Sequence, residues 1–331
     1  MKYCDIIMLG KIMQKKLLVV LSSLLLIISL TSCTNSKARI TTTVYPVAYL
    51  VKYLAGDLVD VQYLSSNDFI CNSKVVENYQ NILKNTDLLL YIGELEPYFD
   101  IYEDILNDYH FEKINLASLS AIYNFKRYSY VDAGGITVVR EEDYYDDPLF
   151  KGEDTFKKDP FIWLDPLAMS SMAATIKQWL QGYYPESEIV IENNFKTLQE
   201  KLVRLDLEYQ NLKELKNAKF VTVAPTFGNW QKSYGIVVDP LIISKYGVLP
   251  TDEQYEYLKK YIKTNKIKYI VNDRTLNEEM TELYNRIKTE LSLKEIKLSS
   301  LSILSQEDLD DNKDYMTIML ENLNALEKAF Q

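Results

Sequence analysis

The sequence contains few of the side chains that bind transition metals or form disulfides. Only one of its 331 residues is histidine, His110, and only three are cysteine, namely Cys4, Cys33 and Cys71. A three-histidine zinc centre or a zinc finger therefore lacks its ligands. A glycine-rich phosphate loop and a Gly-x-Ser-x-Gly motif are also missing, so the sequence points to no catalytic centre.

Clusters of positive charge are missing as well. Lys and Arg number 37 against 47 Asp and Glu, which gives a formal net charge of −10. A chain without a basic patch does not attract phosphate backbones, so nucleic acid is excluded as a partner. The length and the 47% hydrophobic content are typical of a folded protein with about two domains.

The longest apolar run is too short for a comfortable membrane helix. It extends from Leu17 to Leu30, follows Lys15-Lys16 and is interrupted only by serines. A membrane-spanning helix needs about 20 such residues. The run has the length and the positive flank of a signal-peptide core.

The end of this run resembles the signal of bacterial lipoproteins, in which a cysteine is acylated after cleavage. Here the run ends in Leu-Thr-Ser followed by Cys33. We therefore predict a signal peptide over 1–32 with Met13 as the true start, lipidation at Cys33, and a tether over 33–38. These features place the protein on the outer face of the bacterial cytoplasmic membrane, attached by its lipid anchor.

Strand-like and helical segments alternate along the chain, which indicates parallel α/β sheets. The predicted strands are 40–45, 59–64, 87–92, 113–116, 220–223, 236–238, 268–271 and 295–298. The predicted helices are 46–54, 74–85, 252–264, 278–291 and 315–330. They form two α/β lobes, an N-terminal lobe over 39–184 and a C-terminal lobe over 217–331.

A single long helix is predicted over 185–216, between the lobes. Apolar residues recur there at alternating spacings of four and three from Ile191 to Leu212, and Pro185 stands at a first-turn position. A coiled-coil dimer is the alternative interpretation. One helix among α/β units more often packs against its own domains, so we predict a monomer.

The regular pattern stops between 129 and 158. This segment contains the acidic run 141–147 and is predicted to be a solvated loop. Weak binding of Ca²⁺ or Mn²⁺ is the alternative, but the spacing of the acids does not match that of a calcium loop.

Several short motifs follow one another in a specific order. They are Thr41–Pro46 (TTTVYP), Thr86–Leu88 (TDL), Gly93–Tyr98 (GELEPY), Trp163–Pro166 (WLDP), Phe227-Gly228 and Tyr234-Gly235. With the anchor and the long helix, the chain resembles over 38–331 the metal-binding lipoproteins of zinc and manganese ABC transporters, some of which are also called adhesins. The resemblance implies a two-lobed α/β fold that captures a divalent metal and delivers it to an ABC permease and its ATPase.

The resemblance also implies where metal ligands should stand, and this sequence departs from the family there. The corresponding positions hold Cys71, Phe161, Ala224, Ser299 and either Asn272 or Asp273, depending on the register. Phe161 and Ala224 carry no donor atom, so the family's zinc or manganese site cannot form as such.

Two interpretations of Cys71 remain open. As a thiolate it would favour Zn²⁺ or Cu⁺, with help from Asp68, Asp159, Asp273 or Ser299. The simpler interpretation is a small buried thiol in a site that has lost its function.

The other candidate groups have structural interpretations. His110 is far in sequence from these positions, which argues for a surface role and against a hydrolase that pairs it with Cys71. Asp165 and Trp163 are predicted to cap a helix and to pack in the core.

We predict a solute-binding lipoprotein of the metal-type ABC transporters with a degenerate metal site and no enzymatic activity. The alternative is a ligand-free surface lipoprotein that acts as an adhesin or interaction module. The first function predicts polar or aromatic side chains converging around Cys71, Phe161, Ala224 and Ser299. The second predicts a closed, apolar cleft at the same place.

Overall fold

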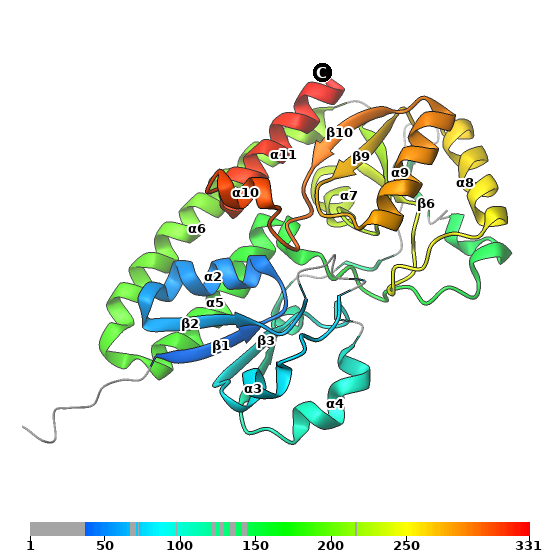
Figure 1. Ribbon diagram of the computed structural model, residues 1–331. Coiled ribbons are helices and arrows are strands. Elements are labelled where there is room, and N and C mark those ends of the chain that lie inside the picture. The colour runs from blue at the N-terminus through cyan, green and yellow to red at the C-terminus, as the bar shows by residue number, and fades with distance from the viewer. Residues whose placement is uncertain are drawn as a thin grey trace, which may run out of the picture. The chain divides into compact units, whose positions relative to one another are not determined.

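The computed structural model describes residues 37–66, 71, 73–96, 98–120, 123–125, 129–132, 137–140, 144–215 and 217–331. Ala38–Gln331 forms one compact unit. It is built on two four-stranded sheets, each entirely parallel and flanked by helices (Figure 1). The predicted signal peptide, the start at Met13 and lipidated Cys33 lie outside the described residues.

The first sheet has the strand order β2-β1-β3-β4. Its strands are β1 (Ala38–Thr42), β2 (Val59–Tyr63), β3 (Leu88–Tyr91) and β4 (Glu112–Asn115). The helices that follow its strands or cover them are α2 (Tyr45–Ala55), α3 (Tyr79–Lys84), α4 (Phe99–Asn107) and α5 (Pro166–Tyr183). Ile40 of central β1 pairs with Val61 on one side and Leu88 on the other.

The second sheet repeats this winding, with the order β10-β9-β7-β8. Its strands are β7 (Lys219–Thr222), β8 (Val237–Pro240), β9 (Tyr269–Asp273) and β10 (Lys294–Leu298). Its helices are α7 (Asn229–Tyr234), α8 (Asp252–Thr264), α9 (Glu278–Leu291), α10 (Gln306–Asp310) and α11 (Tyr315–Phe330). Thr251, Asn277 and Asp314 accept backbone N–H groups at the starts of α8, α9 and α11, which fixes where these helices begin.

The long helix of the sequence is α6 (Glu188–Gln210), with single 3₁₀ turns on either side. Its apolar stripe packs on α2, α5 and α11 of the same chain (Figure 1). The Tyr209 hydroxyl donates to the Met319 carbonyl, 2.7 Å away, and so joins α6 to α11. None of the described helices is long and apolar enough to cross a membrane.

Two predicted elements are shorter than the sequence suggested. A helix was predicted over 74–85, but α3 begins only at Tyr79. The preceding residues Lys74–Val76 run alongside Leu64–Ser66 and exchange backbone hydrogen bonds with them. The strand predicted over 40–45 ends at Thr42, since α2 begins at Tyr45.

Within the segment 129–158, the described residues 129–132, 137–140 and 144–158 are more ordered than the predicted solvated loop; the first residues of the acidic run, 141–143, lie outside the described residues. It contains an antiparallel hairpin of β5 (Ser129–Asp132) and β6 (Thr137–Arg140). Phe150 and Phe156 are buried in the main core. The prediction that this segment is a solvated loop is therefore wrong for these described residues.

Candidate functional site

The segment that leads into α5 is hydrogen-bonded to the second lobe. The buried Trp163 ring donates through Nε1 to the Ser300 carbonyl at 2.7 Å. The Tyr315 hydroxyl donates to the Trp163 carbonyl, also at 2.7 Å. Asp165 caps α5 by accepting the backbone N–H groups of Leu167 and Ala168. The structural roles predicted for Trp163 and Asp165 are confirmed.

The first turn of α7 and the residues around it bind the same segment. Asn229 donates its side-chain N–H to the Phe161 carbonyl at 2.9 Å, and Trp230 donates to the Leu164 carbonyl at 2.8 Å. The Ser233 hydroxyl donates to the Asp165 carboxylate at 2.5 Å. Residues 161–165 therefore connect the two lobes through buried, directional contacts.

Three positions at which the resemblance predicts metal ligands lie within the apolar core. Phe161, Ala224 and Cys71 all belong to the main core cluster. The Phe161 ring packs against Phe156 and Trp163, with centroid distances of 6.1 and 5.4 Å. If position 161 is a ligand position, as the resemblance predicts, an aromatic side chain stands there in place of a donor atom.

Cys71 is a free, buried cysteine. Desolvation raises the pKa of its thiol to about 12. At neutral pH the sulfur is therefore an uncharged thiol, whereas metal binding and nucleophilic attack both use the thiolate.

Two of the remaining predicted positions, Ser299 and Asp273, already make hydrogen bonds within the protein. The Ser299 hydroxyl accepts the Leu301 N–H at 3.2 Å. Asp273 accepts N–H groups from Thr275 and Ser300 through Oδ1, while its buried Oδ2 has no hydrogen-bond partner among the described residues. Burial raises the pKa of the Asp273 carboxyl.

Asn272 and Asp273 occupy opposite faces of β9, as neighbouring strand residues must. Asn272 lines a surface hollow together with Arg274 and Glu321. Asp273 is buried against the loop after β10. Of the two registers, only the one that uses Asp273 faces the interior.

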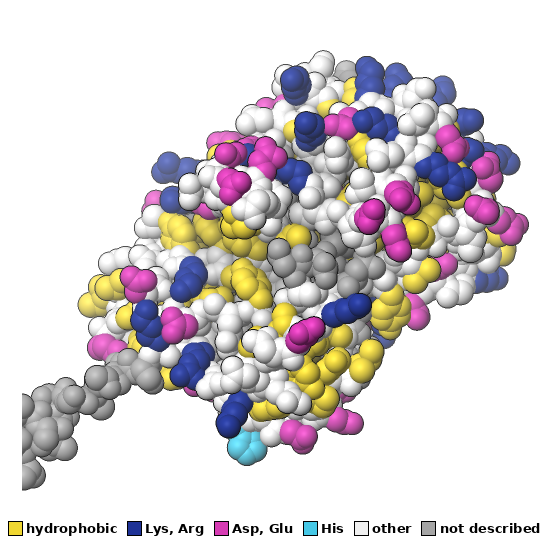
Figure 2. Space-filling model, viewed as in Figure 1, with side chains coloured by type: hydrophobic (Ala, Val, Ile, Leu, Met, Phe, Trp, Pro, Cys, Tyr) yellow, Lys and Arg dark blue, Asp and Glu magenta, His cyan; other side chains and the backbone are white. Residues whose placement is uncertain are grey.

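The described residues do not fit a zinc or manganese site at these positions. No group of three or more His, Cys, Asp or Glu side chains able to hold a metal occurs in the described part of the chain. Asp159 accepts the Phe161 N–H, and Asp68 lies outside the described residues. His110 is exposed and is the single cyan side chain in Figure 2.

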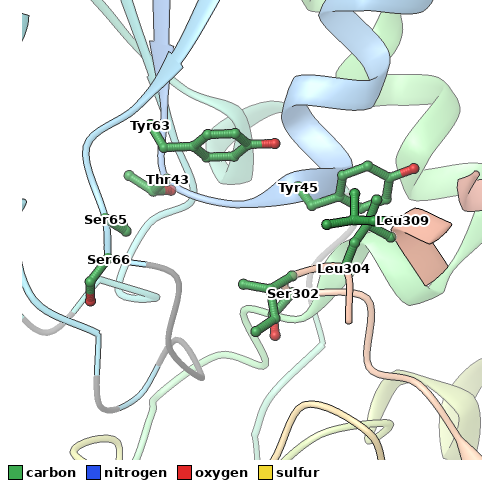
Figure 3. Close-up of a pocket in the computed structure, with 9 residues that line it drawn as sticks. Thr43, Tyr45, Tyr63, Ser65, Ser66, Ser302, Leu304 and Leu309 are labelled. Carbon is green, nitrogen blue, oxygen red and sulfur yellow. The ribbon is translucent and has the colours of Figure 1, made fainter. Parts of the chain in front are cut away.

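A pocket of about 270 Å³ opens between the carboxyl edges of the two sheets (Figure 3). It is lined by hydroxyl-bearing and aliphatic side chains, among them Thr43, Tyr45, Tyr63, Ser65, Ser302 and Leu309. Figure 3 shows the Tyr63 ring reaching from the end of β2 toward Tyr45 at the start of α2. We call this cavity the interlobe pocket.

A buried carboxyl group stands behind one wall of the interlobe pocket. The Thr43 hydroxyl donates to Glu96 Oε1, while Oε2 is buried and has no partner among the described residues. Desolvation raises the pKa of Glu96 to about 7. This site was not predictable from the sequence, because its residues come from distant segments and match no motif.

Comparison with known proteins identifies this architecture. The family model for the zinc-uptake complex component A periplasmic protein (ZnuA) matches residues 40–329. The zinc-binding lipoprotein AdcA of Streptococcus pneumoniae is 26% identical over 328 residues, covering 96% of this chain and 61% of AdcA. The high-affinity zinc uptake system protein ZnuA of Bacillus subtilis is 24% identical, covering 89% and 88% of the two chains. This chain thus spans about three fifths of the length of the AdcA relatives it matches.

Solved structures share the fold. The Zn(II)-bound ZnuA-like domain of Streptococcus pneumoniae AdcA superimposes with a TM-score of 0.66 at 24% identity, covering 89% of this chain and 99% of that domain. The periplasmic zinc-binding protein TroA of Treponema pallidum gives 0.70 at 16% identity, covering 89% and 99%. The predicted two-lobed α/β fold is confirmed, and the match over 40–329 shows that the chain belongs to the zinc-uptake complex component A (ZnuA) family.

Proposed function

We propose that the protein is the extracytoplasmic solute-binding lipoprotein of an ABC transporter and that it no longer captures zinc or manganese at the inherited position. It is anchored through acylated Cys33 to the outer face of the cytoplasmic membrane. As a monomer, it presents its solute to an ABC permease driven by an ATPase. Membership of the ZnuA family supports the transport role.

One observation carries the loss of metal capture. Phe161, Ala224 and Cys71 are buried in a continuous apolar core, where two offer no donor and the third is an uncharged thiol. A metal ion there would lose its hydration without receiving the four or so ligands it needs. Zinc or manganese is therefore not the cargo of this site.

Thermal unfolding of soluble residues 34–331 tests this part of the proposal. After chelation, Zn²⁺, Mn²⁺, Fe²⁺ or Cu⁺ should leave the midpoint unchanged. A ligand at 100 times its dissociation constant would add about 2.7 kcal/mol and shift the midpoint visibly. The ZnuA-like domain of AdcA is the positive control. A shift that Cys71→Ser abolishes would mean that a thiolate site has been rebuilt.

The anchor and the transporter are tested on cells. Mass spectrometry of the membrane-extracted protein should find an acylated Cys33, and Cys33→Ser should release the protein into the extracytoplasmic fluid. Crosslinking in intact cells should capture an ABC permease subunit. An unmodified Cys33 in membrane-extracted protein would refute the anchor.

The alternative role as an adhesin or interaction module is favoured by the same closed, apolar packing around Phe161. A ligand-free module needs no cavity, whereas the interlobe pocket provides one. Crosslinking discriminates between the two functions: an adhesin would be found with surface or host proteins and not with a permease. The proposed role in either case is binding without catalysis, since Cys71 is buried and His110 is exposed.

A further inference from the structure

We propose that the interlobe pocket binds a small, uncharged, single-ring organic solute that carries hydroxyl or amide groups. This inference rests on the proposed solute-binding function and names the class of its cargo. It replaces the metal with a different kind of ligand, at a place that the positions corresponding to metal ligands do not occupy.

The place of the pocket in the fold favours a ligand site. Thr43 follows β1, Tyr63 ends β2, and Ser302 lies in the loop after β10. Parallel α/β sheets present their binding loops at the carboxyl ends of the strands. Here the carboxyl edges of both sheets contribute walls to one cavity, so a bound molecule would contact both lobes together.

The lining chemistry selects against charge. The described residues that form the wall carry hydroxyl groups or aliphatic side chains, and none is Asp, Glu, Lys, Arg or His. Burial raises the pKa of Tyr63 to about 12 and that of Tyr45 further, so both phenols are neutral donors at physiological pH. An ionised ligand would meet no counter-charge among the described lining residues, which is unfavourable wherever it loses water.

Apolar and polar groups occupy different parts of the wall. Leu304 and Leu309 supply an aliphatic surface on the side of the second lobe. Tyr45 and Tyr63 offer ring faces, against which a flat or puckered ring packs well (Figure 3). A volume of about 270 Å³ lies just below the usual range of ligand pockets, which limits the ligand to about one ring.

Ser302 provides an unused hydrogen-bonding group in this wall. Its side chain is fully buried, and its hydroxyl has no hydrogen-bond partner among the described residues. Its backbone carbonyl already accepts the Tyr45 N–H at 3.0 Å, so the loop is held in place independently of the hydroxyl. The hydroxyl is therefore available to a polar substituent of the ligand.

Saturation-transfer NMR on soluble residues 34–331 tests the proposal with phenol, uracil and glucose as neutral probes. Benzoate and benzylamine are the charged counterparts. At least one neutral probe should bind, and the two charged probes should not. The proposal would be overturned if none of the three neutral probes binds, or if the charged probes bind as well as the neutral ones.

Two variants localise the binding. Leu309→Trp places a larger ring at the pocket wall from a side chain that is 51% exposed, so the fold is preserved, and it should weaken binding at least tenfold. Leu207→Trp, at an exposed position on α6, is the matched control and should bind the probe normally. Binding that survives Leu309→Trp would place the ligand elsewhere.

Ser302→Ala separates a ligand contact from a structural role. Because the hydroxyl has no partner among the described residues, its removal should leave the thermal midpoint unchanged or raise it, and it should weaken probe binding severalfold. A lower midpoint with unchanged affinity would contradict the role given to Ser302. Crosslinking to a permease tests the transport function independently of the probes. If the crosslink forms while no probe binds, the transport function is supported and the proposed ligand class is wrong.

Discussion

At the scale of single residues, Glu96 combines burial with an incomplete set of hydrogen bonds. Thr43 donates to one of its oxygens, and the other has no partner among the described residues. A charged carboxylate in such a place is destabilised relative to the protonated form, which explains a pKa near 7.

Removing this charge should stabilise the protein only at higher pH. The folded state holds the Glu96 proton up to about pH 7, whereas the unfolded chain releases it near 4.5, so stability falls as pH rises through this window. Glu96→Gln should therefore raise the free energy of unfolding at pH 8 by up to about 3 kcal/mol, which appears as a higher thermal midpoint. At pH 4 the substitution should have little effect. Glu200→Gln, at an exposed position on α6, is the control. Equal effects of Glu96→Gln at both pH values would contradict the argument.

The Cys71 thiol should be inert in the folded protein. It is the only cysteine in residues 34–331, it is buried, and its pKa is raised to about 12. A maleimide reagent at pH 7 should label it only after denaturation, as followed by mass spectrometry. Rapid labelling of the native protein would show an accessible thiolate and reopen the metal and nucleophile interpretations.

At the scale of elements, the turn before α5 does two things at once. Asp165 caps the helix, and the same carboxylate accepts the Ser233 hydroxyl from α7. The cap stabilises one lobe, while the second contact joins the lobes. The two effects can be separated by substitution.

Asp165→Ala should lower the free energy of unfolding more than Ser233→Ala. The first change removes the cap, worth about 1–2 kcal/mol, together with the contact between lobes. The second removes only that contact, worth about 1 kcal/mol. Urea unfolding of the two variants measures the difference. Equal losses would mean that the cap contributes nothing here.

Elements with clear end signals were predictable from the sequence. The bounds of α8, α9 and α11 agree with the prediction, because an amphipathic stripe and a capping side chain coincide at each start. The extent of helix α5 was not predicted, although Asp165 was expected to cap a helix. Its sequence is rich in Ala and Ser, so its apolar face is weakly marked and its position depends on tertiary contacts.

At the scale of the whole molecule, one apolar core extends through both lobes. The same cluster contains Val59 and Leu88 from the first sheet and Phe220 and Ile270 from the second. The lobes therefore share buried surface, and neither is complete without the other.

Unfolding should accordingly be a single cooperative transition. Differential scanning calorimetry of residues 34–331 should give one peak, with calorimetric and van't Hoff enthalpies in agreement. Two resolved peaks would mean that the lobes unfold independently and that the contacts made by 161–165 are weak.

The candidate site was less predictable than the fold. The resemblance indicated which positions matter for a metal, and Phe161 and Ala224 exclude the usual ligands by residue type alone. The interlobe pocket depends on how the loop around Ser302 approaches Thr43 and Tyr63. No local pattern encodes such a long-range approach, so only the folded chain brings these residues together.

The repeated winding of the two sheets gives each recess at a carboxyl edge a counterpart in the other lobe. Superposing one strand order on the other exchanges β1 with β7, β2 with β8 and β4 with β10. The pseudo-symmetric counterpart of the open pocket then lies after β7 and β8. There Thr155 forms a β-bridge with Ser244, and the Asp154 carbonyl accepts the Lys245 N–H. Of the two topologically equivalent recesses, the segment around Thr155 therefore occupies one, and the other is open as the interlobe pocket.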